Sequence, residues 1–209
     1  MPEGFSPPRV KVCGLTRPED AAVAVDAGAE AIGFVAWQDS PRHVSAGKVA
    51  SLVQGLPHGV CSVGVMVQIN PDAGLAWAEI AGVDALQLCG EQKASDWKDF
   101  PLPLLRRVAV EKGAQEALEA WLEIADAFVL DHPSSPGGSG QEVEHSIAAS
   151  LVDCAPCILA GGLTPQCVVQ AIREVCPVGV DASSGLEIKP GIKDAEKVTS
   201  FVTLALEAL

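Results

Sequence analysis

The sequence predicts a single-domain (β/α)8 TIM barrel, an α/β fold in which eight parallel strands alternate with helices. Eight short apolar runs recur along 209 residues, which is about the smallest length on which eight β/α units can be built. The last two runs are followed by glycine and small hydroxyl residues, in CILAGGLTP (157–165) and VGVDASSGLE (178–187). In such barrels, anion-binding turns commonly follow the seventh and eighth strands.

The eight runs are predicted strands because each is short, apolar and without alternation, as expected for parallel strands buried on both faces. They span residues 10–12, 31–35, 61–67, 85–88, 104–110, 127–130, 157–159 and 178–180. Their starts lie roughly 20 to 30 residues apart, which leaves room for a crossover helix after each strand. We therefore expect one domain over residues 1–209, with the proline-rich residues 1–8 as a flexible N-terminal segment.

Helix starts are predicted where this scheme needs them. Thr16 and Glu19 form a capping-box pattern, and Asn70-Pro71 and Thr164-Pro165 place a capping residue before a proline. A doubly wound open sheet has the same alternation of strands and helices. It is disfavoured because no G-x-G-x-x-G motif follows a strand and the glycine-rich turns come last.

The charge balance limits the possible partners. The chain has 14 Lys and Arg against 27 Asp and Glu, a net charge of −13, so its surface should repel nucleic acid and anionic membranes. It has no secretory signal pattern and no apolar run long enough to span a bilayer. We expect a cytoplasmic protein that binds an anionic small molecule through helix N-termini and one or two arginines.

The cysteines indicate neither a disulfide framework nor a metal site. Seven cysteines are scattered along the chain, which favours reduced thiols. Cys154 and Cys157 form a C-x-x-C pair, but no second Cys or His pair lies nearby. We therefore predict no bound metal.

Two residues stand at predicted strand ends, where a barrel delivers side chains to its catalytic face. Cys13 ends the first strand just before a predicted helix start, and the helix N-terminus is expected to lower its pKa and favour the thiolate. Asp131 ends the sixth strand, and a partly desolvated carboxyl can stay protonated near neutral pH and act as a general acid. Structural roles, as a packing cysteine and a loop cap, remain open for both.

Two loops add candidate binding groups. Arg42 lies in DSPRHVS (39–45) after the second strand, where it is either a solvated loop residue or a bidentate carboxylate ligand. HPSSPGGSGQ (132–141) has the glycine, serine and proline density of a long active-site loop.

Six segments together match one known pattern, in order and over nearly the whole chain. They are KVCGLTRPEDA (11–21), AIGFVAWQDSPRHVS (31–45), VDALQLCGE (83–91), FVLD…GGSG (128–140), ILAGGLTPQCV (158–168) and GVDASSGLE (179–187). In this combination the chain resembles the phosphoribosylanthranilate isomerase family. The resemblance implies a cofactor-free Amadori rearrangement in tryptophan biosynthesis, which converts N-(5-phosphoribosyl)anthranilate to the carboxyphenylamino-deoxyribulose phosphate.

The resemblance also implies roles for individual residues. Cys13 would be the general base and Asp131 the general acid, while Arg42 would bind the anthranilate carboxylate. Asp181 would contact a ribose hydroxyl, and Gly140 would belong to a loop that closes over the phosphosugar substrate. The phosphate would be held by backbone N–H groups around Gly161, Gly162, Ser183 and Ser184.

Three positions depart from the family's usual pattern. Cys89 stands where a histidine is usual, Arg106 where a lysine is common and Gln68 where an asparagine is common. Another phosphate-binding barrel enzyme and a non-catalytic anion-binding barrel remain alternatives, because the late glycine turns are shared and a fold alone does not determine function. The sequence leaves open whether the protein is a monomer or a homodimer.

Overall fold

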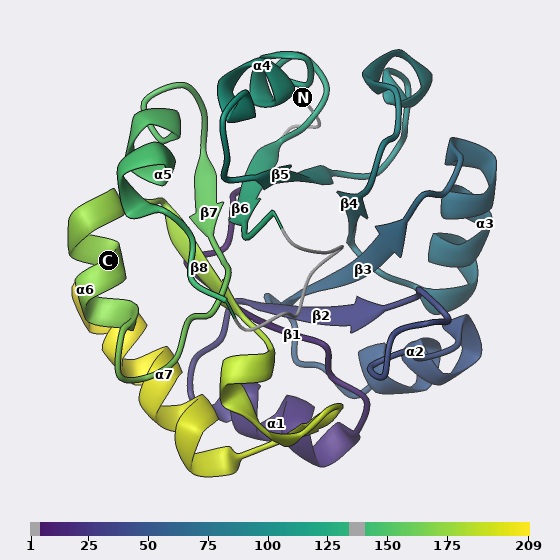
Figure 1. Ribbon diagram of the computed structural model, residues 1–209. Coiled ribbons are helices and arrows are strands. Elements are labelled where there is room, and N and C mark those ends of the chain that lie inside the picture. Colours follow the sequence, from purple (N-terminus) through teal and green to yellow (C-terminus); the bar gives the residue numbers. More distant parts are fainter. Residues whose placement is uncertain (1–4, 134–140) are drawn as a thin grey trace.

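A closed parallel barrel forms the centre of the computed structural model, which describes residues 5–133 and 141–209. Figure 1 looks along the barrel and shows the helices as a ring around the strands. The strands are β1 (Val10–Cys13), β2 (Ala31–Val35), β3 (Cys61–Val67), β4 (Ala85–Cys89), β5 (Leu104–Ala109), β6 (Ala127–Asp131), β7 (Cys157–Leu159) and β8 (Gly179–Ala182). They follow one another in chain order, and β8 pairs with β1, so the predicted barrel is confirmed.

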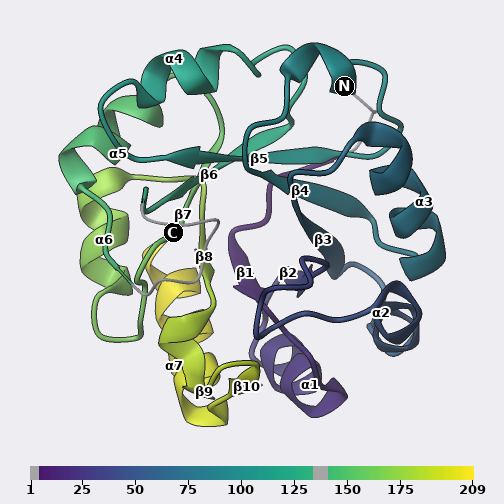
Figure 2. The ribbon, with the colours of Figure 1, turned by 45° about the vertical axis from the view of Figure 1, so that its right-hand side comes forward.

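The helices around the barrel follow the predicted alternation with one exception. They are α1 (Pro18–Asp26), α2 (Ala46–Val53), α3 (Pro71–Ala81), α4 (Ala114–Glu119), α5 (His145–Leu151), α6 (Val168–Val175) and α7 (Ala195–Ala208). Between β4 and β5 the chain forms only a short 3-10 helix, η1 (Ala94–Trp97), where we expected a crossover helix. The buried Trp97 ring there packs against Phe100, with ring centroids 4.9 Å apart. Figure 2 shows β4 and β5, the strands that this segment connects, in a view turned by 45°.

Two of the three predicted helix caps are wrong. Thr16 does not cap α1, because its Oγ1 donates to the Gly191 carbonyl at 2.6 Å and Arg17 occupies the N-cap position. Thr164 does not cap α6, because that helix begins at Val168, with Cys167 at its N-cap. The third prediction is confirmed, since Asn70 Oδ1 accepts the Ala73 N–H at 2.9 Å at the start of α3.

We expect Asn70→Ala to lower the free energy of unfolding by about 1 kcal/mol, because the Ala73 N–H loses its side-chain acceptor. Asn70→Asp keeps an acceptor at the same place and should stay close to the wild type. Urea denaturation of the three proteins measures the difference. Equal stability of the alanine and aspartate variants would contradict a capping role.

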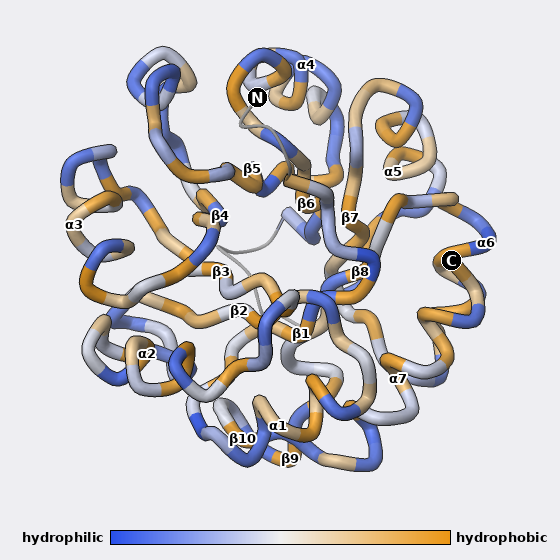
Figure 3. The backbone as a smooth tube through the Cα atoms, turned by 180° about the vertical axis from the view of Figure 1, so that it is seen from behind, coloured by the Kyte–Doolittle hydropathy of each residue, from blue (hydrophilic) through white to orange (hydrophobic). Residues whose placement is uncertain are grey.

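Apolar side chains fill two regions, namely the space between the strands and the helices and the end of the barrel interior where the strands begin. Figure 3 shows the helices alternating between hydrophobic and hydrophilic segments around the ring, as expected for helices that cover a core on one side. Inside the barrel, a cluster that includes Ala31, Val63 and Leu105 closes the end where the strands begin. Phe5 packs against this cluster and Pro8 is buried, so residues 5–8 are held to the barrel.

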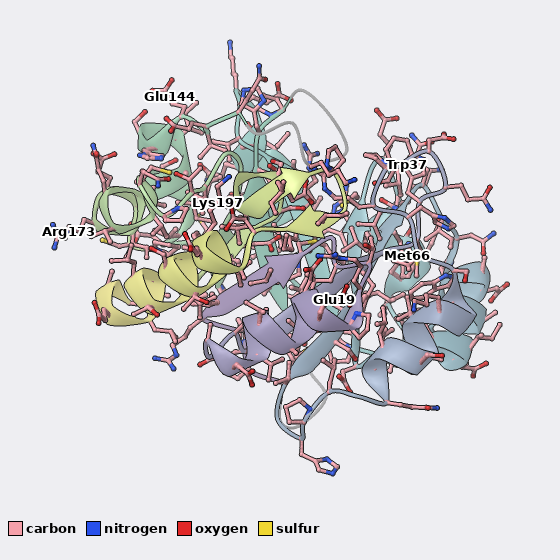
Figure 4. The ribbon with its side chains drawn as sticks, turned by 90° about the horizontal axis from the view of Figure 1, so that it is seen from below. Glu19, Trp37, Met66, Glu144, Arg173 and Lys197 are labelled. Carbon is pink, nitrogen blue, oxygen red and sulfur yellow. The ribbon has the colours of Figure 1, made fainter. Side chains whose placement is uncertain are left out.

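A short antiparallel hairpin follows β8 and completes the rim. It consists of β9 (Glu187–Lys189) and β10 (Ile192–Lys193). The hairpin lies against α1, where Lys193 N–H donates to Asp20 at 3.1 Å, and Figure 4 shows it (yellow) beside the helix that carries Glu19 (purple). This contact places two charged side chains, Glu187 and Lys193, at the mouth of the barrel.

In the described ranges, no helix is both long and apolar enough to cross a membrane.

Candidate active site

A pocket that is open to solvent lies at the C-terminal ends of the barrel strands and encloses about 740 Å³ of space. It brings together all the predicted site residues that the structure describes. These are Cys13, Arg42, Asp131, Gly161, Gly162, Asp181, Ser183 and Ser184. The remaining predicted residue, Gly140, lies outside the described residues.

One end of the pocket is lined by backbone that can approach an anion closely. Gly161 and Gly162 have φ of +77° and +67°, a conformation that favours glycine, and a Cβ on Gly162 would lie 2.8 Å from the backbone of Gln141. Within residues 5–133 and 141–209, the N–H groups of Gly161, Gly162 and Ser184 have no hydrogen-bond acceptor. We expected a helix to start immediately after the glycines, but α6 begins only at Val168, so these amides supply the donors without direct help from that helix.

Cys13 points into the pocket beside a buried lysine. Val10 and Val12 belong to the outer core, so the alternate residues Lys11 and Cys13 face the inside of the barrel. A Cβ on Gly33 would lie 2.7 Å from Cys13 Sγ and 3.1 Å from Lys11 Nζ, so the absence of a side chain there makes room for both groups.

The predicted lowering of the Cys13 pKa is wrong. Burial raises the pKa of the thiol, and the positive charge of Lys11 offsets this only in part. The helix after β1 starts at Pro18, five residues beyond the cysteine, and so Lys11 is the main group that lowers the pKa. The thiolate therefore forms more readily as the pH rises above neutral.

Asp181 is held by the same lysine and faces the pocket with an unused acceptor. Lys11 Nζ donates to Asp181 Oδ2 at 2.9 Å, and the lysine side chain is fully buried. Asp181 Oδ1 and Gln87 Oε1 are buried and have no hydrogen-bond partner in the described part of the chain. Buried acceptors of this kind indicate a ligand that brings hydroxyl or amine donors.

Two hydrogen-bond donors fix the carboxyl group of Asp131, which is partly buried in the pocket. Arg107 Nε donates to Asp131 Oδ2 at 3.2 Å, and the His132 N–H donates to Oδ1 at 2.8 Å. The Arg107 Nη2 group also donates to the His132 carbonyl at 2.6 Å. The arginine therefore fixes both the carboxyl and the turn that carries it.

Arg42 is buried rather than a solvated loop residue. Its Nε and Nη2 donate to the two carboxylate oxygens of Glu187, each at 2.8 Å, and this ion pair occupies the bidentate face that we had assigned to a ligand. Lys193 Nζ donates to Glu187 at 3.0 Å and to the Ser183 carbonyl at 2.9 Å. Burial acts to raise the pKa of Glu187, but Arg42 and Lys193 outweigh it and lower that pKa below its usual range.

We expect Glu187→Gln to raise KM about tenfold with little change in kcat, because a charge-assisted pair contributes about 1.5–3 kcal/mol and its loss frees Arg42 to move. Steady-state kinetics measures both constants. Glu19→Gln, at an exposed position that pairs with Arg17, is the matched control and should behave as wild type. An unchanged KM in Glu187→Gln would show that the ion pair does not position Arg42.

An apolar wall completes the pocket. The wall consists of Val35, Trp37, Val65 and Val67, which pack around Cys13 and Cys89 at the C-terminal ends of β1 to β4. Three pocket or site residues, Trp37, Gln87 and Lys11, were not predicted from the sequence. The signal for Lys11 was a charged residue within an otherwise apolar strand, and a buried lysine is rare unless it is paired.

The three departures from the family pattern lie at different distances from the pocket. Arg106 lies over the Trp121 ring at 4.7 Å and donates to Gln92, away from the pocket lining. Cys89 is buried beneath the apolar wall, and burial raises its pKa to about 11. Gln68 has a φ of +47°, a left-handed conformation that an asparagine adopts more readily.

Across the residues that the structure describes, no group of three or more His, Cys, Asp or Glu side chains is arranged to hold a metal ion.

Comparison with known proteins shows the family of this chain. The model of the N-(5'-phosphoribosyl)anthranilate isomerase family matches residues 10–204. The chain belongs to this family. The match decides between the alternatives above in favour of an aldose–ketose isomerase of tryptophan biosynthesis, the enzyme that the sequence motifs predicted.

Relatives match over nearly their whole length. The chain is 40% identical to the N-(5'-phosphoribosyl)anthranilate isomerase of Pelobacter propionicus over 204 residues, covering 95% of this chain and 96% of the relative. It is 38% identical to that of Synechococcus elongatus over 213 residues, covering 96% and 98% of the two chains.

Solved structures agree. A phosphoribosylanthranilate isomerase from Thermotoga maritima superposes with a TM-score of 0.88 at 32% identity, covering 95% of this chain and 98% of that one. A second isomerase structure, in complex with reduced 1-(o-carboxyphenylamino)-1-deoxyribulose 5-phosphate, has a TM-score of 0.86 at 32% identity, with the same coverage.

Proposed function

We propose that the pocket carries out the Amadori rearrangement of N-(5'-phosphoribosyl)anthranilate by general acid and base catalysis, with Cys13 as the base and Asp131 as the acid. The observation that carries this proposal is that both side chains line one pocket from β1 and β6, strands separated by β7 and β8 around the barrel. The rearrangement needs one proton donor and one proton acceptor at different atoms of the sugar, and two single groups on different strands supply them.

Other parts of the pocket suit the other groups of this substrate. The N–H groups of Gly161, Gly162 and Ser184, which have no acceptor among the described residues, would bind the phosphate. At the other end of the substrate, the anthranilate carboxylate would be bound by Nη1 of Arg42, which Glu187 leaves unused. The wall formed by Val35, Trp37, Val65 and Val67 would contact the aromatic ring.

The buried acceptors would recognise the ribose. Asp181 Oδ1, which has no partner within the described residues, would accept a hydroxyl hydrogen, and Gln87 Oε1 would accept a second hydroxyl or the anthranilate amine. This use satisfies two acceptors that are otherwise desolvated at a cost.

Asp131 and Cys13 would each carry out one proton transfer on the way to the enolamine. Asp131 donates a proton to the ring oxygen of the ribose while the C1–O bond breaks, which leaves a Schiff base between C1 and the anthranilate nitrogen. The Cys13 thiolate removes the proton from C2, and the electron pair moves through the new double bond to nitrogen, giving an enolamine. The enolamine then loses the proton of its C2 hydroxyl and gains a proton at C1, which gives the ketone product. The sequence of steps needs no cofactor.

The remaining expectations concern the kind of partner, the location and the oligomeric state. The net charge of −13 favours a small anionic substrate gripped by local donors and disfavours nucleic acid, and we place the enzyme in the cytoplasm. A neighbouring structure from Thermotoga maritima is that of a dimeric isomerase converted to monomers, and for this chain both the monomer and the homodimer remain predictions.

The proposal is tested by generating N-(5'-phosphoribosyl)anthranilate in the cuvette and following the loss of its fluorescence after the protein is added. Rapid loss is expected with the wild type. A Cys176→Ser variant, altered at an exposed cysteine, should match it. No loss with a protein that is folded by circular dichroism would overturn the proposed function and favour a binding role for the pocket.

A further inference from the structure

Lys11 belongs to a buried charge cluster whose members come from the first and last strands of the barrel. Its Nζ donates to Asp181 Oδ2 at 2.9 Å and lies next to Cys13 Sγ, since both atoms surround the same side of Gly33. The lysine side chain has no exposed surface, and Asp181 and Cys13 are exposed by only 7% each. The three groups therefore interact with little screening by water.

The charges of this cluster cannot all be satisfied at once. Lys11 and Asp181 balance each other when the Cys13 thiol is neutral, so ionising Cys13 adds a second negative charge beside a single ammonium group. Each acid, when ionised, raises the free energy of the other's anion, which makes the two titrations interdependent. The acid that holds the lysine closely is stabilised as an anion.

We propose that Lys11 is a positioning residue that acts as the shared counter-ion of Asp181 and Cys13, so that the two acids compete for its charge and Lys11 controls how readily the thiolate forms. The inference rests on the proposed function in one respect, namely that Cys13 is the base. The ionisation of Cys13 is measured independently of any substrate.

The other ionisable groups around Cys13 do not take over this role. Lys193 lowers the pKa of Cys13 less than Lys11 does, and its Nζ is already engaged with Glu187 and the Ser183 carbonyl. Cys89 lies in the same apolar cluster, but its pKa is raised to about 11, so it stays neutral. Lys11 is the cation that lies next to Sγ in the described part of the chain.

A direct consequence is that removing Lys11 and removing the charge of Asp181 should shift the pKa of Cys13 in opposite directions. Without Lys11, Cys13 faces the negative charge of Asp181 alone, and its pKa should rise. Without the charge of Asp181, Lys11 is left to Cys13, and the pKa of the thiol should fall. General disturbance of packing would not produce shifts of opposite sign.

The experiment measures the rate at which iodoacetamide alkylates Cys13 between pH 6 and pH 11.5, with peptide mass spectrometry to separate this cysteine from the others. We expect the midpoint of the rate profile to rise by about one pH unit or more in Lys11→Met, which lowers the rate near neutral pH about tenfold. Lys11→Arg keeps the charge and should restore a midpoint close to the wild type. Asp181→Asn should lower the midpoint by about one pH unit.

Lys11→Met leaves a buried unpaired carboxylate and can fail to fold, in which case the double variant Lys11→Met/Asp181→Asn removes both charges. Its midpoint should lie above that of Asp181→Asn by about one pH unit. Circular dichroism and thermal melting confirm that the compared proteins are folded. Shifts of the same sign in Lys11→Met and Asp181→Asn, or an unmoved midpoint in the folded lysine variant, would overturn the inference.

The readout also separates this inference from the proposed function. If the two variants shift the midpoint in opposite directions but the wild type does not turn over the substrate, the charge coupling holds and the proposed reaction is rejected. Turnover by the wild type without these shifts would reject the role of Lys11 alone. Where both hold, the pH at which kcat/KM rises should move in each variant in the same direction as the alkylation midpoint.

Discussion

Replacing Cys13 with serine is expected to lower kcat about a thousandfold, with KM within a few fold of the wild-type value. Serine is nearly the same size, so it fits among Val35 and Val65, but its hydroxyl ionises far above the pH at which the thiol does. The substrate should still bind, because the proposed phosphate and carboxylate groups of the pocket are unchanged. Steady-state kinetics with substrate generated in the cuvette measures both constants.

The matched control for this variant is Cys89→Ser. Cys89 is buried in the same apolar cluster but does not line the pocket, so its replacement reports the cost of a hydroxyl in this layer without removing the base. We expect less than a tenfold loss of kcat in the control. A Cys13→Ser enzyme as active as the control would assign the base to another residue.

The pH dependence of the wild type provides a further sign. A general base works only when it is deprotonated, and burial raises the pKa of Cys13. The value of kcat/KM should therefore increase as the pH rises from neutral towards the pKa of this thiol. The Cys13→Ser variant should lack this rise over the same range.

Asp131→Asn is expected to lower kcat by about two to four orders of magnitude, because the amide cannot donate a proton to the ring oxygen as a carboxylic acid does. The amide oxygen can still accept a hydrogen bond from Arg107 or from the His132 N–H, so the turn after β6 should keep its shape. Steady-state kinetics of the wild type and the variant, with substrate generated in the cuvette, measures this loss.

Asp126→Asn is the control for the acid. Asp126 precedes the other end of β6 and accepts the Leu104 N–H at 2.8 Å, so its replacement affects the barrel floor and leaves the pocket intact. We expect a lower melting temperature and a kcat close to the wild type. If Asp131→Asn behaved in the same way, its carboxyl would be structural and the proton donor would have to be sought elsewhere.

The barrel itself was predictable because its strands are buried on both faces and therefore form continuous apolar runs. Their ends were less predictable, and β8 begins at Gly179 and continues to Ala182 because its last residues pair with β1. The missing helix between β4 and β5 was not predicted either. The segment there is anchored by burial of Trp97, a tertiary contact that local spacing does not reveal.

Motifs located the pocket residues, but the electrostatics of the site depend on pairings between distant positions. Arg42 was identified as a candidate ligand, yet its partner Glu187 lies 145 residues away, and the ion pair changes which edge of the guanidinium is free. The pKa of Cys13 was predicted in the wrong direction because burial outweighs the neighbouring charges. Burial is a property of the closed barrel, and no local pattern around Cys13 reports it.

The pairing of β1 with β8 also has a consequence for how the enzyme becomes active during its synthesis. Lys11 and Asp181 are opposite each other in the register of these two strands and are separated by 170 residues in the chain. During synthesis, the strand that supplies the facing carboxylate therefore emerges from the ribosome long after Cys13 does. The carboxylate that faces Lys11 is in place only when β8 pairs with β1, so a half-barrel fragment carrying Cys13 would lack the Lys11–Asp181 ion pair that surrounds this thiol.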